Sequence, residues 1–113
     1  MALSQSERKT QWLIGIGLYS PDYDEVVSTA RAALHDRNPW VAAAALHNIG
    51  HLPRRFGHVD WVLVRHAKAV ACTRLYQAPV RHAFSDMVDD VENFVPFKVR
   101  MREAQYAAEM SPD

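Results

Sequence analysis

The stretch Asn38–Leu52, which reads NPWVAAAALHNIGHL, decides the fold. Asn38 can cap the start of a helix, and Pro39 suits the first helical position, where its missing N–H costs nothing. One helix face is then marked by residues at i, i+3, i+4, i+7, i+8 and i+11, namely Val41, Ala44, Ala45, Asn48, Ile49 and Leu52. The alanines keep part of this face thin, so a neighbouring helix can approach closely. We therefore expect a central helix that the rest of the chain covers.

Composition indicates one ordinary globular domain. The chain has 113 residues, of which 49% are hydrophobic and 23% are charged. Thirteen basic and thirteen acidic residues cancel, so the net charge gives no general attraction to nucleic acid or anionic membranes. The single cysteine, Cys72, favours a reducing compartment, and its apolar helical surroundings predict that it is buried. The apolar run Trp12–Tyr19 is too short to span a bilayer, which favours a cytoplasmic protein.

Caps and hydrophobic spacing predict further helices on both sides of the central one. They cover about 6–19, 24–35, 61–73 and 79–95, and a last helical segment covers 97–110. Pro53 should end or kink the regular central helix after Leu52, and Gly57 is a natural C-terminal cap. Trp40 and Trp61 fall in first helical turns, where they either close the edge of the core or serve as binding anchors.

The helix pairs at about 22–56 and 60–95 repeat one another. The second helices match with a shift of 39 residues and the first helices with a shift of 37. The matches include Val41 with Val80, Ala44 with Ala83, Ile49 with Val88, Leu52 with Val91, Val26 with Leu63, Ala30 with Ala67 and Ala33 with Val70. A helix pair repeated at roughly 40 residues is typical of an α-solenoid. The alternative is a bundle of five or six helices with chance similarity.

The segment 36–52, DRNPWVAAAALHNIGHL, resembles a HEAT repeat in its short turn, proline, valine, small residues and Ile-Gly. The region from Trp12 to Phe94, with GHLPRRFGHVDWV and DMVDDVENF, is similar to small bacterial HEAT-repeat-like proteins. The resemblance implies a single all-α domain over 1–113. This domain would be a short, right-handed α-solenoid of HEAT-like helix pairs with flanking N- and C-terminal helices. It also implies protein recognition, since some small bacterial helical proteins of this kind are immunity partners of secreted toxins.

Six histidines raise the question of a metal site. His47 and His51 lie four residues apart on one helix face, where two imidazoles can bind one metal ion, and Asp86 or Asp90 could supply a third ligand. Some iron hydroxylases built from HEAT repeats carry His-Glu dipeptides, but this chain has none. We therefore expect surface or capping histidines and no metal or other cofactor. A metal-dependent or lyase-like enzyme on a HEAT scaffold is the alternative.

Charge is segregated along the chain although its sum is zero. The region from Arg54 to Arg81 holds six basic residues and one acid, and it is followed by the acidic residues Asp86, Asp89, Asp90 and Glu92. A nucleic-acid-binding HEAT protein is a second alternative, which the neutral balance and the adjacent acids oppose. No nucleophile or phosphate-binding glycine loop accompanies the carboxylates. They therefore indicate a docking surface rather than acid–base catalysis.

These observations predict a non-catalytic protein-binding module, and most specifically an immunity protein, or antitoxin, that neutralises a bacterial toxin. In a HEAT stack the second helix of each pair lines the concave face. That geometry nominates as partner-binding residues His47, His51, Arg54, Arg55, Asp86, Asp89 and Asp90. If the partner is a nuclease with a basic cleft, the aspartates would occupy that cleft in place of phosphates.

Overall fold

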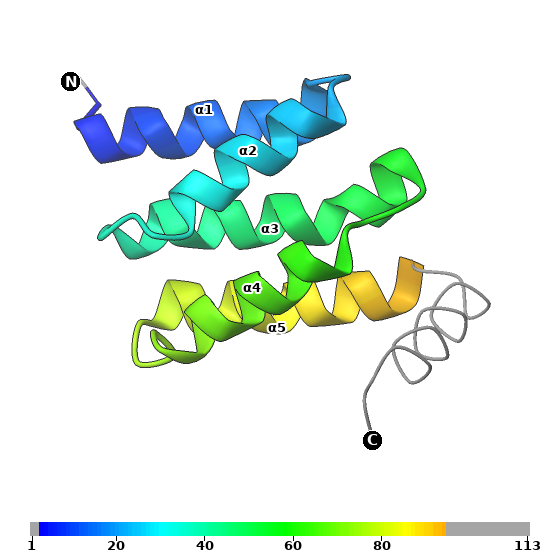
Figure 1. Cartoon of the computed structure of the whole chain (residues 1–113). Helices are drawn as coiled ribbons and strands as arrows, with labels where there is room; N and C mark the ends of the chain where they lie inside the picture. Colours follow the sequence, from blue (N-terminus) through cyan, green and yellow to red (C-terminus); the bar gives the residue numbers. More distant parts are fainter. Residues whose placement is uncertain (1–2, 95–113) are drawn as a thin grey trace.

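The computed structural model describes residues 3–94, and every regular element in this range is an α-helix. The helices of this range are α1 (Gln5–Tyr19), α2 (Tyr23–Ala33), α3 (Pro39–Phe56), α4 (Trp61–Cys72) and α5 (Ala78–Phe94) (Figure 1). The expected all-α fold class is confirmed. None of these helices is long and apolar enough to cross a membrane. The expected helical segment 97–110 lies outside the described residues.

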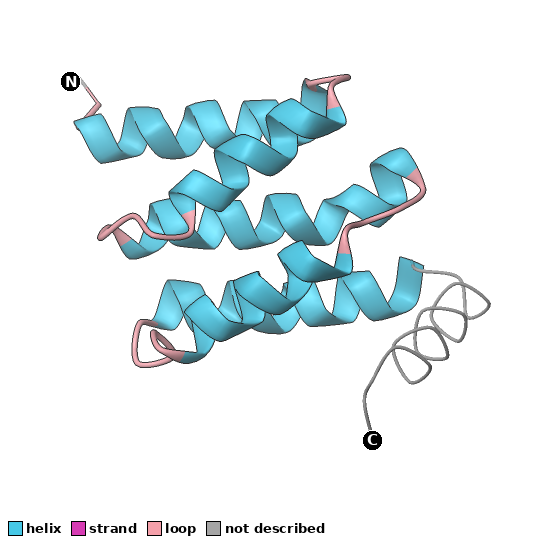
Figure 2. Ribbon diagram, in the orientation of Figure 1, coloured by secondary structure: helices cyan, strands magenta, loops and turns pink. Residues whose placement is uncertain are grey.

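The helices form two layers (Figures 1 and 2). α1, α3 and α5 lie side by side and run in the same direction, and α2 and α4 cross them on one side. α3 contacts α1 and α5 in its own layer and α2 in the other. The helix that begins at Pro39 is therefore central, as expected. The two helix pairs follow one another with α1 as an N-terminal flanking helix, and a HEAT-like solenoid stays an interpretation of this arrangement.

The helix starts are set by short polar side chains. Ser4 accepts a hydrogen bond from the backbone N–H of Glu7, whose carboxylate in turn accepts from the N–H of Ser4. Asn38 accepts from the N–H groups of Trp40 and Val41, as expected for the cap of the central helix. The remaining caps are Asp22 for α2 and Asp60 for α4. These caps fix where each helix begins and hence which residues share a face.

α3 runs further than the sequence predicted. Pro53 lies inside the helix, which stays regular to Phe56 and bends in its last turns (Figure 1). Proline cannot donate to the carbonyl of Ile49, but its fixed φ is itself helical, and Pro53 is buried. Gly57 then ends the helix with φ of 78° and donates its N–H to the carbonyl of Pro53 at 2.8 Å. The expected cap is confirmed, and of the two outcomes expected at Pro53 the structure shows a bend rather than the end of the helix.

The core gathers the apolar stripes of all five helices. The repeat-matched positions buried in both copies are Val41 and Val80, Ala44 and Ala83, Leu52 and Val91, Val26 and Leu63, Ala30 and Ala67, and Leu34 and Ala71. In the second copy Val70 and Val88 are only partly buried, because they lie nearer the edge of the stack. The matched stripes thus bury one another, since a single pair could not cover its own apolar face.

Cys72 corrects one expectation, because its side chain is exposed rather than buried. It is the last residue of α4, and the preceding Ala71 occupies the buried position of that turn. Neighbouring helical residues point about 100° apart, so an apolar sequence context does not by itself decide which of the two is covered.

Candidate binding groove

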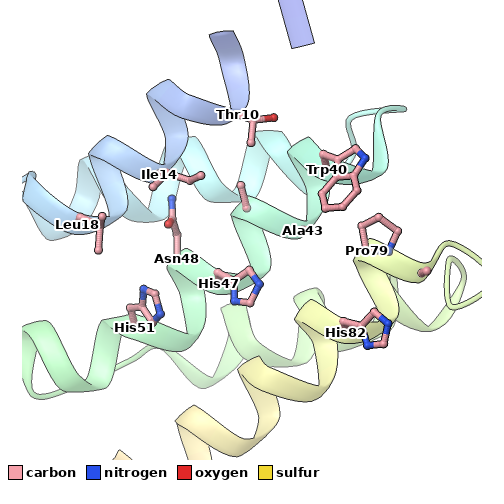
Figure 3. Close-up of a pocket in the computed structure, with 12 residues that line it drawn as sticks. Thr10, Ile14, Leu18, Trp40, Ala43, His47, Asn48, His51, Pro79 and His82 are labelled. Atoms are coloured by element: carbon pink, nitrogen blue, oxygen red, sulfur yellow. The ribbon is translucent and has the colours of Figure 1, made fainter. Parts of the chain in front are cut away.

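A groove of about 530 Å³ opens on the face formed by α1, α3 and α5 (Figure 3). Its lining is mostly apolar and comprises Thr10, Ile14, Leu18, Trp40, Ala43, Ala44, His47, Asn48, His51, Ala78, Pro79 and His82. Trp40 is 64% exposed, Leu18 45% and Ile14 44%. Large apolar side chains exposed together around a hollow are typical of an interaction site. Trp40 is therefore mostly exposed at the groove rather than enclosed at the edge of the core.

The floor of the groove is hollow because α3 contributes small side chains there. Ala43 and Ala44 line the groove with α1 residues on one side and α5 residues on the other, and their methyl groups leave space that larger side chains would fill. Trp40 and Pro79 face each other at one end of the groove (Figure 3). The alanine run that marks the central helix in the sequence therefore has a second consequence, a cavity between the two outer helices of the layer.

Asn48 fixes α1 at the wall of the groove. It is 3% exposed, and its side-chain Nδ2 donates to the carbonyl of Leu13 in α1 at 2.8 Å. A β-carbon on Gly17 would collide with the same amide group. Because Gly17 has none, the two helices can approach closely enough for this buried hydrogen bond. The bond sets the position from which Ile14 and Leu18 reach the groove.

Three histidines border the groove, and their environments differ. His82 is exposed, whereas His47 and His51 are partly buried, with ring centroids 6.3 Å apart. Burial of the imidazole lowers the pKa of His51 below its ordinary value of 6.5, and the positive charge of Arg54 acts in the same direction. The Nδ1 atom of His51 is buried without a hydrogen-bond partner. The His51 ring thus carries a buried polar atom that nothing in residues 3–94 satisfies.

The nominated residues lie on α3 and α5, but they do not form one cluster. The Nε2 atom of His51 lies 4.0 Å from Oδ2 of Asp90, across a contact made close by Gly50, whose β-carbon would stand 3.1 Å from Cα of Met87. Asp86 and Asp89 are exposed on α5. Within residues 3–94, no three His, Cys, Asp or Glu side chains gather as a metal site would require. The ligand set considered for His47, His51 and the aspartates is therefore not assembled.

The two nominated arginines have different surroundings. Arg54 is exposed, but the guanidinium of Arg55 donates to the carbonyls of Gly17 at 2.7 Å and Ser20 at 2.6 Å. Its plane also lies over the ring of Phe56, 4.7 Å from the centroid. Arg55 therefore satisfies carbonyls at the C-terminal end of α1, where a helix leaves acceptors unpaired. Its charge is used inside the molecule rather than displayed at an interface.

Sequence reasoning missed half of the groove. Thr10, Ile14 and Leu18 recur at four-residue spacing and form the α1 wall, whereas Leu13 and Gly17 form its buried side. The helical spacing of Trp12, Leu13, Ile16 and Tyr19 predicts a different apolar stripe for this helix, but Trp12 and Tyr19 are exposed. The spacing of Ile14 and Leu18 was the available signal. It pointed to a second apolar face on a helix that needs only one for its core.

Comparisons with known proteins add no information about the groove. No protein-family model, curated protein or solved structure was found to match the chain.

Proposed function

We propose that this chain is a non-catalytic protein-binding module and that the groove between α1, α3 and α5 receives its partner. The observation that carries the proposal is the exposure of Trp40, Leu18 and Ile14 around one hollow. An apolar groove between helices suits the apolar face of an amphipathic helix, whose residues at i, i+4 and i+7 occupy successive pockets. Aromatic anchors such as Trp40 typically contribute most of the binding energy of such an interface.

The charges beside the groove indicate which partner it fits. Beyond His82 on α5, the exposed Asp86 and Asp89 and the partly exposed Asp90 extend the groove face with negative charge. A partner segment with an apolar stripe and basic residues at one end complements both features, and opposite charges speed association. A toxin that acts on phosphate-containing substrates presents such a basic surface. The most specific form of the proposal is therefore a cytoplasmic immunity protein whose aspartates occupy that surface.

Capture from the native host tests the binding proposal. The tagged chain, a Trp40→Ala and Leu18→Ala double variant, and a Tyr76→Ala control are compared by mass spectrometry and then by affinity measurement with the purified partner. Tyr76 is 79% exposed and lies outside the groove, so Tyr76→Ala removes a large exposed side chain without changing the groove. We expect one stoichiometric partner that the control retains and the double variant binds at least about tenfold more weakly. A partner bound equally by all three proteins would show that the groove is not its site.

Charge reversal tests the nature of the partner. The Asp86→Lys and Asp90→Lys double variant should slow association with a basic partner and weaken the salt dependence of the rate. Glu25→Lys, on α2 in the other layer, is the matched control, because it adds the same kind of charge change away from the groove. An unchanged association rate in the aspartate variant would eliminate the basic-cleft form of the proposal while leaving the groove itself in place.

A further inference from the structure

Two histidines meet on the layer of helices that does not form the groove. His35, in the turn after α2, and His66, within α4, are 31 residues apart in the sequence. Their Nε2 atoms lie 3.2 Å apart, the ring centroids 5.3 Å apart, and the ring planes are inclined by 47°. His35 is exposed and His66 is partly buried. The coordinating atoms of both imidazoles therefore converge on one point at the surface.

This separation suits two kinds of interaction. As a hydrogen bond, the pair requires one Nε2 to carry a proton and the other to be unprotonated. As metal ligands, two nitrogens at about 2.0–2.1 Å from one ion would lie about 2.9 Å apart at a right angle and about 3.4 Å apart at a tetrahedral angle. The observed 3.2 Å falls between these two limits. The separation of the two Nε2 atoms thus already suits a metal ion, which would replace the shared proton once both rings turn their Nε2 lone pairs toward it.

We propose that His35 and His66 bind one late first-row transition-metal ion, with both Nε2 atoms as the protein ligands. No third His, Cys, Asp or Glu completes a set with them in the described part of the chain, so water occupies the other positions. Two imidazole ligands suit Cu²⁺, Ni²⁺ and Zn²⁺, and the order of affinity should be Cu²⁺ first. The site is therefore open and exchangeable rather than a closed structural centre.

A metal ion at this position would join the two helix pairs. His35 belongs to the end of α2 and His66 to α4, and the whole of α3 lies between them in the sequence. The ion would close this 31-residue loop and so link the first pair to the second. The site lies on the α2–α4 layer and is independent of the groove. A chain that bound no metal there would therefore leave the proposal of partner binding at the groove unaffected.

Titration of the full chain with NiCl₂ or ZnSO₄ tests the site, followed by calorimetry and by thermal unfolding. We expect one ion per chain, a rise in the unfolding midpoint on binding, and an affinity at least about tenfold lower in His66→Ala and in His35→Ala. His47→Ala with His51→Ala is the matched control, because it also removes two histidines whose rings lie near each other, here on α3. This control should bind the ion as the wild-type chain does.

Copper provides a spectroscopic readout that does not depend on stability. With one equivalent of Cu²⁺, electron paramagnetic resonance should show nitrogen couplings from two imidazoles in the wild-type chain and from one in His35→Ala. Circular dichroism confirms that each variant is folded. Unchanged affinity in both single variants, loss of binding in the His47 and His51 control, or no binding at millimolar Ni²⁺ would each overturn the proposal.

Discussion

The amide group of Asn48 occupies the space that a β-carbon on Gly17 would need, at the contact between α3 and α1. The asparagine is buried and donates to the carbonyl of Leu13, one turn before that glycine. A buried polar side chain in an apolar face is tolerated because it is hydrogen-bonded. The pair therefore fixes both the distance and the register between the two helices, and with them the wall of the groove.

Replacing Gly17 with alanine should destabilise the fold. The new methyl group would displace the side chain of Asn48, break its bond to Leu13 and force the helices apart, at a cost of about 2–4 kcal/mol. The free energy of unfolding in urea measures this effect. Gly15→Ala is the matched control, because a β-carbon there meets nothing within 4 Å and the change removes a helical glycine. The control should be more stable than the wild type by about 0.5–1 kcal/mol. Equal stability of the two variants would show that Asn48 does not set the contact.

Replacing Arg55 with lysine should also weaken the attachment of α1. Lysine keeps the charge but cannot donate to the carbonyls of Gly17 and Ser20 at the same time, since it lacks the planar fork of the guanidinium. We expect a loss of about 1–2 kcal/mol in the free energy of unfolding. Arg65→Lys, exposed on α4, should change it by less than about 0.5 kcal/mol. If the two variants lost similar amounts of unfolding free energy, the charge of Arg55 rather than its two hydrogen bonds would account for its contribution to stability.

The sequence predicts the helices well because their signals are local. Asn38 and Asp60 cap helices where expected, and the stripe that contains Val41 and Ile49 is buried. Pro53 departs from its local rule because its fixed φ is compatible with a helix and the residue is buried, so α3 continues despite the one hydrogen bond that proline cannot donate. Element type is thus decided by short-range chemistry, and element length is partly decided by packing.

The groove was harder to predict, because it depends on which face of each helix is covered. The half of α1 from Trp12 to Tyr19 is apolar on several sides, so periodicity cannot separate the buried Leu13 from the exposed Ile14 and Leu18. Gly17 determines which face of α1 is buried, because its missing side chain lets α3 pack closely against that side of the helix. Likewise, the proximity of His51 to Asp90 depends on the register between α3 and α5, which no pattern within either helix contains.

The ion pair between Lys9 and Asp36 gives a prediction for the acid range. Nζ of Lys9 lies 2.7 Å from Oδ2 of Asp36, and this hydrogen bond is the main reason that the pKa of Asp36 lies below its ordinary value of 3.8. The stability it contributes is present above pH 3.8 and is lost as the pH falls through the folded pKa. Because the lysine is half exposed, we expect less than about 1 kcal/mol. In Lys9→Gln, an NMR titration of Asp36 should show a higher pKa; an unchanged value would assign the shift to the N–H of Asn38 instead.

His51 gives the prediction for the physiological range. The cause of its lowered pKa is, first, burial of the imidazole. Among the charged groups around it, Arg54, Arg55 and His47 lower the pKa further, and Asp90 raises it. The unfolded chain therefore binds a proton at this residue near pH 6.5, whereas the folded chain binds it only at a lower pH. Stability from His51 is complete above pH 6.5 and declines as the pH falls through the folded pKa.

Comparison of the wild type with His51→Gln isolates this effect, since all other titrating groups are shared. The free energy of unfolding should decrease more steeply in the wild type between pH 7 and pH 5, and the two curves should run parallel above pH 7. Asp90→Asn should steepen the decrease, because it removes the one nearby charge that favours the protonated ring. If His51→Gln kept the full pH dependence, the decline would have to come from other groups.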